Sequence, residues 1–158
     1  MDLKEKYDAV LITIGASTDK KLGLEGEDAK GVISAVQFLR DVGYGTQESL
    51  EGKEVAVIGG GNVSMDAVRT SVRLGAKKVS IVYRRRVADM TALPDEISGA
   101  EAEGVEIKTL MAPSRIEKDE EGNVKGIWVT PQMISNIKGG RASVKPTGKM
   151  TYLSHVRH

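Results

Sequence analysis

The sequence contains no cysteine, and this absence removes several kinds of chemistry at once. Disulfide bonds, thiolate metal ligands and thiol redox centres are all excluded. The lack of cysteine is also compatible with a cytoplasmic protein, which is the location we expect. Histidine is nearly absent too, since the sequence has only His155 and His158, both close to its C-terminal end. We therefore expect neither a metal site nor a histidine-based catalytic group.

Aromatic residues, net charge and long apolar runs are scarce as well. Aromatics make up 4% of the 158 residues and the formal net charge is +1, which argues against a base-stacking surface and against a general attraction to nucleic acid. No apolar run approaches the roughly 20 residues of a membrane-spanning helix. The first ten residues, MDLKEKYDAV, carry charges but no apolar signal-peptide core. We expect one ordinary domain, with no nucleic-acid or membrane partner.

What the sequence does contain is a glycine turn between an apolar strand and a helix. Four apolar residues, 55–58, lead into three consecutive glycines, and apolar residues at helical spacing follow from Asn62 to Leu74. Gly59, Gly61 and Ser64 fit the pattern G-x-G-x-x-small, in which the first glycine allows a tight turn and the second lets a pyrophosphate approach the backbone. The third position is small so that helix and strand pack closely. A glycine-rich turn that binds no ligand is the alternative.

A second strand, residues 79–83, completes a β-α-β unit of the length expected for parallel strands. In a unit that binds NAD, an acidic residue at the end of this strand accepts hydrogen bonds from the ribose 2′-hydroxyl. Here the strand ends in Tyr83 and three arginines. Guanidinium groups can bind a 2′-phosphate bidentately, so we predict NADP(H), recognised mainly by Arg84 and Arg85. The alternative is a solvated basic loop.

Asn62 and Asp66 lie one helical turn apart behind the glycines. Asn62 is most simply the residue that caps the helix, with a ligand contact as an added possibility. Asp66 can either face the nicotinamide half of a dinucleotide or complement the positive helix end. We predict no catalytic and no metal-binding residue. The candidate cofactor-binding residues are Gly59, Gly60, Gly61, Asn62, Val63, Ser64, Asp66, Tyr83, Arg84, Arg85 and Arg86.

The remaining pattern predicts further strands and helices around this unit. Before it we expect a buried strand at residues 7–14 and a helix over 34–42 capped by Ser34, followed by a polar connector at 46–53. After it we expect a helix that begins near Pro94 and ends at Gly104. The predicted later elements are a strand at 105–110, a hairpin of 114–118 with 124–130, and an unassigned segment from 131 to 158.

Several segments together resemble the glutamate synthase small (beta) subunit and its relatives, which include dihydropyrimidine dehydrogenase and the NADPH-binding subunit of the electron-bifurcating ferredoxin–NADP transhydrogenase. They are VAVIGGGNVSMDAVRT, LGAKKVSIVYRRR, MTALPDEISGAEAEGVE and EEGNVKGIWV, and the resemblance covers about residues 5–135. It implies an α/β fold: a Rossmann-like three-layer NAD(P)-binding domain of FAD- and NAD(P)-linked reductases, with a parallel sheet plus a β-hairpin or meander.

The resemblance also implies roles for residues and segments. Gly59, Gly61 and Asn62 would line the pyrophosphate, Arg84 and Arg85 the 2′-phosphate, and Asp66 would lie near the nicotinamide. The segment KYDAVLITIGAS is similar to a strand of the family's FAD domain, and GEDAKGVISAVQFL is similar to the connector into the NADP domain. The implied organisation is a flavin-domain remnant and connector at 1–50, an NADP(H)-binding domain at 51–135 and an uncertain segment at 136–158.

The departures from the family limit what this chain does alone. The family's iron–sulfur cysteines, its first FAD glycine motif and its late Gly-Asp motif are absent. We therefore expect part of a larger NADPH-dependent flavin oxidoreductase, with FAD bound in the full-length protein only, and nucleotide binding without turnover by this chain. Expected partners are the rest of the same flavoprotein, or a synthase large subunit or iron–sulfur protein. The alternatives are a non-catalytic NADP-binding regulatory module and an electron-transfer partner module.

Overall fold

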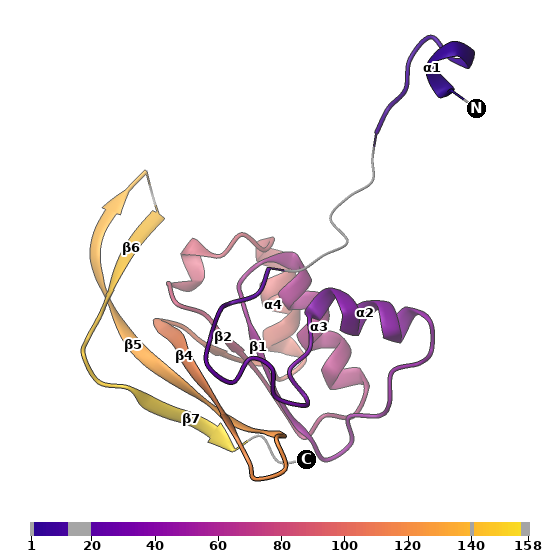
Figure 1. Cartoon of the computed structure of the whole chain (residues 1–158). Helices are drawn as coiled ribbons and strands as arrows, with labels where there is room; N and C mark the ends of the chain where they lie inside the picture. The colour runs from indigo at the N-terminus through magenta and orange to yellow at the C-terminus, as the bar shows by residue number, and fades with distance from the viewer. Residues whose placement is uncertain (1, 13–19, 140, 156–158) are drawn as a thin grey trace.

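In a computed structural model that describes residues 2–12, 20–139 and 141–155, the chain folds into three layers (Figure 1). A parallel sheet forms the middle layer. Helices cover one of its faces, and an antiparallel sheet covers the other. The predicted α/β class, with a parallel sheet followed by a meander, is confirmed.

The parallel sheet has the strand order β1 (Glu54–Ile58), β2 (Lys78–Val82) and β3 (Glu106–Lys108). The helix α3 (Asn62–Arg73) connects β1 to β2. Ile58 is paired with Val82 in the register of these two strands. The chain therefore leaves both strands at the same edge of the sheet, which brings the glycine turn and the arginine run to neighbouring positions.

The helical layer consists of α2 (Ala35–Gly43), α3 and α4 (Pro94–Ala102). Met65 and Val68 of α3 are fully buried against the sheet, as their helical spacing predicts. The predicted helix ends are also confirmed: Ser34 caps α2, Pro94 begins α4 and Gly104 follows its end. Two shorter helices are α1 (Leu3–Lys6) and the 3₁₀ helix η1 (Val87–Asp89). No helix in the described residues is long and apolar enough to cross a bilayer.

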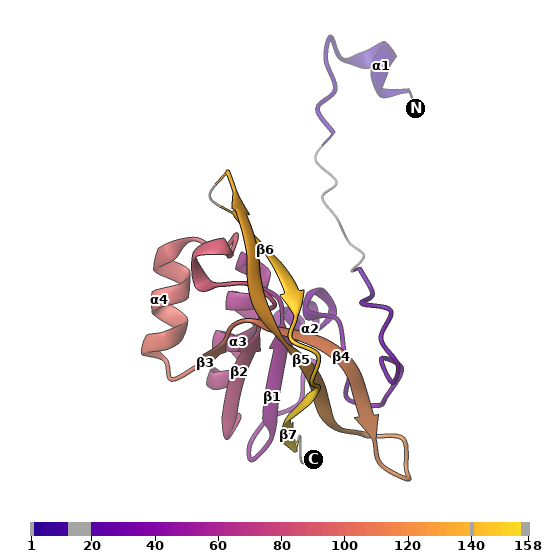
Figure 2. The ribbon, with the colours of Figure 1, turned by 90° about the vertical axis from the view of Figure 1, so that its left-hand side faces the viewer.

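The antiparallel layer is built around one long strand, β5 (Val124–Lys138) (Figure 2). Its first half pairs with β4 (Met111–Lys118) and with β7 (Thr151–His155), and its second half pairs with β6 (Arg141–Pro146). Ile127 and Val129 of β5 pack against Val82 of the parallel sheet, with Ile58 and Met111 beside them. This second core joins the two sheets.

Two parts of the chain differ from the sequence prediction. The strand expected at 7–14 is wrong over residues 7–12, which form no strand, while residues 13 and 14 lie outside the described residues. Leu11 is 88% exposed, because no described strand lies alongside to pair with this segment. Conversely, the unassigned segment after residue 131 contains the end of β5 and the strands β6 and β7.

Candidate functional site

The glycine turn lies between the end of β1 and the start of α3. The amide of Gly59 donates to the carbonyl of Val82 at 3.2 Å, which ties the turn to β2. Gly59 has a φ of +143°, and a Cβ there would lie 2.5 Å from Oγ of Ser64, a side chain that is buried at the first turn of α3. Glycine at position 59 and a small residue at position 64 are therefore both required by the packing of the turn, as predicted.

Gly60 is enclosed by the loop that follows β2. A Cβ at this position would lie 2.9 Å from the ring of Tyr83 and 2.9 Å from Cγ of Met90. Its carbonyl accepts hydrogen bonds from the amides of Thr91 and Ala92, at 2.9 and 3.1 Å. The glycine turn and residues 90–92 are thus fixed to each other.

Gly61 is different, because the described part of the chain gives no packing reason for glycine there. A Cβ would meet only Oγ1 of Thr91, at an ordinary contact distance of 3.4 Å. Gly61 is the N-cap of α3, with extended backbone and no side chain to cap the helix. The first turn of an α-helix presents amide groups without intrahelical partners, so this end of α3 is open to an anion.

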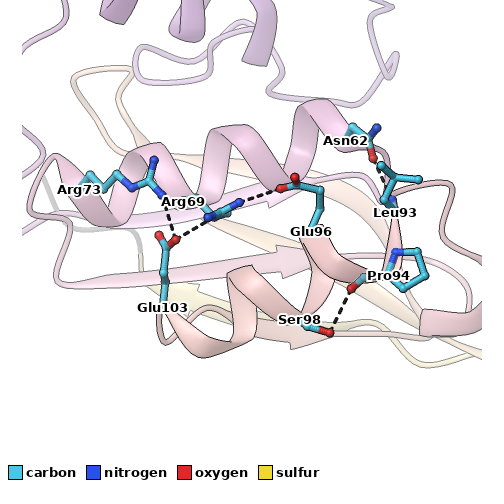
Figure 3. Close-up of polar contacts among 8 residues, drawn as sticks. All are labelled: Asn62, Arg69, Arg73, Leu93, Pro94, Glu96, Ser98 and Glu103. Atoms are coloured by element: carbon cyan, nitrogen blue, oxygen red, sulfur yellow. Dashed lines mark hydrogen bonds and ion pairs between the residues drawn. The ribbon is translucent and has the colours of Figure 1, made fainter.

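Asn62 does not cap the helix as predicted. Gly61 holds that position, and Asn62 is the first helical residue. Its Oδ1 instead accepts a hydrogen bond from the amide of Leu93 at 2.9 Å (Figure 3). Leu93 is the N-cap of α4 and has no capping side-chain bond of its own. Asn62 therefore links the starts of the two helices, a role that depends on a partner 31 residues away.

Val63 and Asp66 lie on exposed parts of α3. The Val63 side chain is 45% exposed beside the helix start. Asp66 is exposed one turn further along, and its side chain makes no hydrogen bond or ion pair with another described residue. The structure leaves both predicted alternatives for Asp66 open.

The three arginines after β2 have three different environments. Arg84 is exposed and has no side-chain partner among the described residues. Arg85 is half-buried, and its Nε is buried without a hydrogen-bond partner in the described structure. Arg86 binds the buried carboxylate of Asp89 through Nε and Nη2, at 2.8 and 2.9 Å. The run is therefore not a uniform basic loop.

Asp89 is a residue that the sequence analysis missed. Its side chain is fully buried, and the Arg86 guanidinium, followed by the amide of Ala142, holds the pKa of its carboxyl well below the ordinary value of 3.8. An arginine and an aspartate three residues apart are common on protein surfaces, so the spacing does not reveal burial. The contact with Ala142, 53 residues away, has no signal in the local sequence.

A charged network joins the later turns of α3 to α4 (Figure 3). Arg69 binds Glu96 at 2.7 Å and Glu103 at 2.8 Å, and Arg73 binds Glu103 at 2.9 Å. A Cβ at Gly99 would lie 3.4 Å from Cζ of Arg69, an ordinary contact distance, which shows that the guanidinium lies directly over α4 at this position. The hydrogen bond from Arg69 lowers the pKa of Glu103.

Other parts of the described structure offer no comparable site. No group of three or more histidine, cysteine, aspartate or glutamate side chains gathers there as metal ligands would. A hollow of about 480 Å³ lies between residues 25–28 and 115–118. Its lining includes no residue of the glycine turn or the arginine run.

Comparison with known proteins supports an oxidoreductase family. The profile of the pyridine nucleotide-disulphide oxidoreductase family matches residues 2–138. The chain is 46% identical over 127 residues to the NADP(+)-dependent formate dehydrogenase subunit beta of Moorella thermoacetica, and 43% identical over 136 residues to the glutamate synthase [NADPH] small chain of Escherichia coli. These matches cover 79% and 80% of this chain, but 18% and 29% of the relatives. The predicted resemblance to the glutamate synthase small subunit is confirmed.

Solved structures show the same fold. FprA of Mycobacterium tuberculosis, in complex with NADPH, has a TM-score of 0.76 at 22% identity; the match covers 98% of this chain and 49% of FprA. The thioredoxin reductase of Giardia duodenalis has a TM-score of 0.53 at 23% identity, over 82% of this chain and 38% of the reductase. The arrangement of three layers is thus shared with larger reductases.

Proposed function

The chain belongs to the pyridine nucleotide-disulphide oxidoreductase family, and from that premise we propose that it is the NADP(H)-binding domain of a glutamate synthase small-chain-like oxidoreductase, in which NADPH delivers hydride to a flavin. The observation that carries the proposal is the start of α3 directly after Gly61, where no side chain caps the amide groups of the first turn. Neither packing nor a capping side chain accounts for glycine at this position. Close approach of a pyrophosphate to the backbone does account for it.

The charges around the turn fit the same ligand. The start of α3 favours the binding of an anion, because its amide groups are free to donate hydrogen bonds and the helix dipole adds positive potential there. Arg84 and Arg85 follow the neighbouring strand at the same sheet edge. The residues directly after β2 are Tyr83 and three arginines rather than an acidic reader of the ribose 2′-hydroxyl, which supports recognition of a 2′-phosphate. We infer that the chain binds NADPH in preference to NADH.

The chain's own residues would bind and orient the nucleotide rather than carry out chemistry. NADPH supplies the hydride when it is bound, and the flavin that accepts it would belong to the full-length protein. Asp66, exposed one turn from the open helix end, is proposed to lie on the nicotinamide side. The division at about residues 50 and 135 into connector, nucleotide domain and C-terminal segment is part of this proposal.

Partners and location follow from the same reasoning. Relatives of this chain are, by their names, subunits or small chains of oxidoreductases, among them the NADPH-Fe(3+) oxidoreductase subunit beta of Geobacter sulfurreducens, 40% identical over 129 residues. We propose that the partner is the rest of the same flavoprotein, or a synthase large subunit or iron–sulfur protein. A cytoplasmic location, expected from the absence of cysteine, belongs to this proposal too.

Calorimetric titration of the chain with NADPH, NADH and FAD tests the proposal. We expect NADPH to bind more tightly than NADH, and FAD not to bind. Arg84→Ala and Arg85→Ala should each weaken NADPH by about 10-fold to 100-fold, because a hydrogen bond to a charged group contributes about 1.5–3 kcal/mol, and should leave NADH unchanged.

Lys77→Ala is the matched control, because it removes one exposed positive charge just before β2, at the opposite edge of the sheet. It should change neither affinity. Equal losses of NADPH and NADH in the arginine variants, or tight binding of FAD by the wild-type chain, would contradict the proposal. NADP(H) binding without any flavin reduction in the full-length protein would instead favour a regulatory module.

A further inference from the structure

We propose that Asp89 is a positioning residue for recognition of the 2′-phosphate: it fixes the loop after β2 so that Arg84 and Arg85 can bind the nucleotide while Arg86 is bound to Asp89. The inference rests on the proposed function, since it concerns the phosphate that distinguishes NADPH from NADH. Asp89 itself is buried and is not proposed to touch the nucleotide. It acts through the backbone and side chains that it holds.

The carboxylate of Asp89 has four hydrogen-bond donors around it. Nε and Nη2 of Arg86 donate at 2.8 and 2.9 Å, and the backbone amide of Arg86 donates at 3.2 Å. The fourth donor is the amide of Ala142 in β6, at 2.8 Å. A fully buried carboxylate with this set of donors is satisfied, so its position in the loop is closely determined.

The main chain of Asp89 adds a third segment to this centre. Its carbonyl accepts a hydrogen bond from the hydroxyl of Tyr83 at 2.8 Å, and the Tyr83 ring in turn packs against Gly60. Asp89 therefore connects the end of β2, the arginine run and β6. Through Tyr83 it also reaches the glycine turn, where the pyrophosphate is proposed to bind.

These contacts engage Arg86 and leave two arginines for a ligand: Arg84, which is exposed, and Arg85, which is half-buried and whose Nε has no hydrogen-bond partner in the described structure. Two backbone hydrogen bonds fix the loop at this point. The amide of Tyr83 donates to the carbonyl of Lys108 at 2.9 Å, and the amide of Leu110 donates to the carbonyl of Arg85 at 3.1 Å. The Arg86 guanidinium is already bound to the carboxylate of Asp89. A pair of guanidiniums on a fixed backbone is the arrangement that binds a phosphate bidentately with little loss of freedom.

A purely electrostatic role for Asp89 predicts the opposite effect of its removal. If Asp89 only neutralised Arg86, then Asp89→Asn would release a third cation next to the site and strengthen NADPH binding. If Asp89 positions the loop, the same variant weakens NADPH binding although the site becomes more positive. The sign of the change therefore separates the two roles.

The experiment is calorimetric titration of the 158-residue chain and its variants with NADPH and with NADH. We expect Asp89→Asn to weaken NADPH by about 10-fold or more, the loss expected when one charge-assisted contact is misplaced, and to change NADH by less than about twofold. Asp95→Asn removes the same charge from an exposed position in the first turn of α4 and should alter neither affinity.

A second variant keeps the test decisive if Asp89→Asn fails to fold. The double variant Arg86→Gln with Asp89→Asn leaves no unpaired buried charge, and we expect it to show the same selective loss of NADPH. Wild-type-like or stronger NADPH binding in a folded Asp89→Asn chain or in the double variant would overturn the inference. A wild-type chain without preference for NADPH would instead refute the proposed function.

Discussion

At the scale of single residues, the three glycines of the turn are present for different reasons. Gly59 is required by its backbone conformation and by Ser64, and Gly60 is required by Tyr83 and Met90. Gly61 has no steric reason inside the described chain, and its N-cap position is one that Ser, Thr, Asn and Asp fill as well as glycine. The sequence pattern indicated positions 59 and 61 as the functional glycines, but it could not show that position 60 is the one enclosed by protein.

Substitution by alanine separates these reasons. Gly60→Ala should destabilise the chain by about 1–3 kcal/mol, because the added methyl group overlaps the Tyr83 ring and Met90. Gly61→Ala should change the free energy of unfolding by less than about 1 kcal/mol, since its backbone is extended and the space is open. It should nevertheless weaken NADPH binding by about tenfold or more, because the methyl group would occupy the position proposed for the pyrophosphate.

Urea unfolding and NADPH titration of both variants provide the measurement. A Gly61→Ala chain that binds NADPH as tightly as the wild type would remove the main argument for the pyrophosphate site. A Gly60→Ala chain with wild-type stability would show that the Tyr83 ring can move aside.

Residues whose partners are distant in sequence could not be predicted. Gly59, Gly61 and Ser64 and the arginine run follow rules that act within one β-α-β unit, so their pattern is visible in the sequence. Asn62 has its partner 31 residues away and Asp89 has one 53 residues away. No local pattern encodes such contacts, because they depend on how β6 and α4 pack against the unit.

At the scale of elements, local rules predicted the helices well and the strands less well. Helix ends follow from nearby residues such as Ser34, Pro94 and Gly104, whose effects act within one turn. A strand, in contrast, requires a neighbouring strand to pair with, and the local sequence does not identify that neighbour. Residues 7–12 have a strand-like composition but no described neighbour, whereas β6 and β7 have weak patterns and pair with β5.

The contact between α3 and α4 should depend on pH. The pKa of Glu103 lies below its ordinary value of 4.5, mainly because of the hydrogen bond from Arg69. A group with a lowered pKa in the folded state stabilises it above the ordinary value, and this contribution disappears as the pH falls through the folded pKa. Glu103→Gln should therefore be less stable than the wild type at pH 7, with a difference that shrinks below about pH 4.5.

Urea midpoints measured from pH 7 to pH 3 check this expectation. Glu101→Gln is the control, because Glu101 is exposed on the same helix and has no side-chain partner among the described residues. A constant difference between Glu103→Gln and the wild type across this range would show that the Arg69 contact does not set the pKa.

At the scale of the whole molecule, β5 holds the antiparallel layer against the parallel sheet. Ile127 lies in the second core and is 5% exposed, whereas Ile137, ten residues further along the same strand, is 51% exposed. Ile127→Ala should lower the free energy of unfolding by about 2–5 kcal/mol, the usual cost of this truncation in a core. Ile137→Ala, the matched control, should cost less than about 1 kcal/mol.

Urea unfolding followed by Trp128 fluorescence and by circular dichroism measures both variants. Coincident transitions would indicate that the layers unfold together. A small effect of Ile127→Ala, or an early loss of the fluorescence signal alone, would mean that the antiparallel sheet adds little to the stability of the rest.

The hydrogen bonds from Thr91 and Ala92 to Gly60, and from Leu93 to Asn62, have an entropic consequence. They close the chain into a ring that runs from the glycine turn through α3, β2 and the arginine run and back again. Folding thus orders the glycine turn and the backbone of the arginine run, the two halves of the proposed site, before a nucleotide binds. The conformational entropy that loops commonly lose on binding is already lost here, so more of the contact energy is available as affinity.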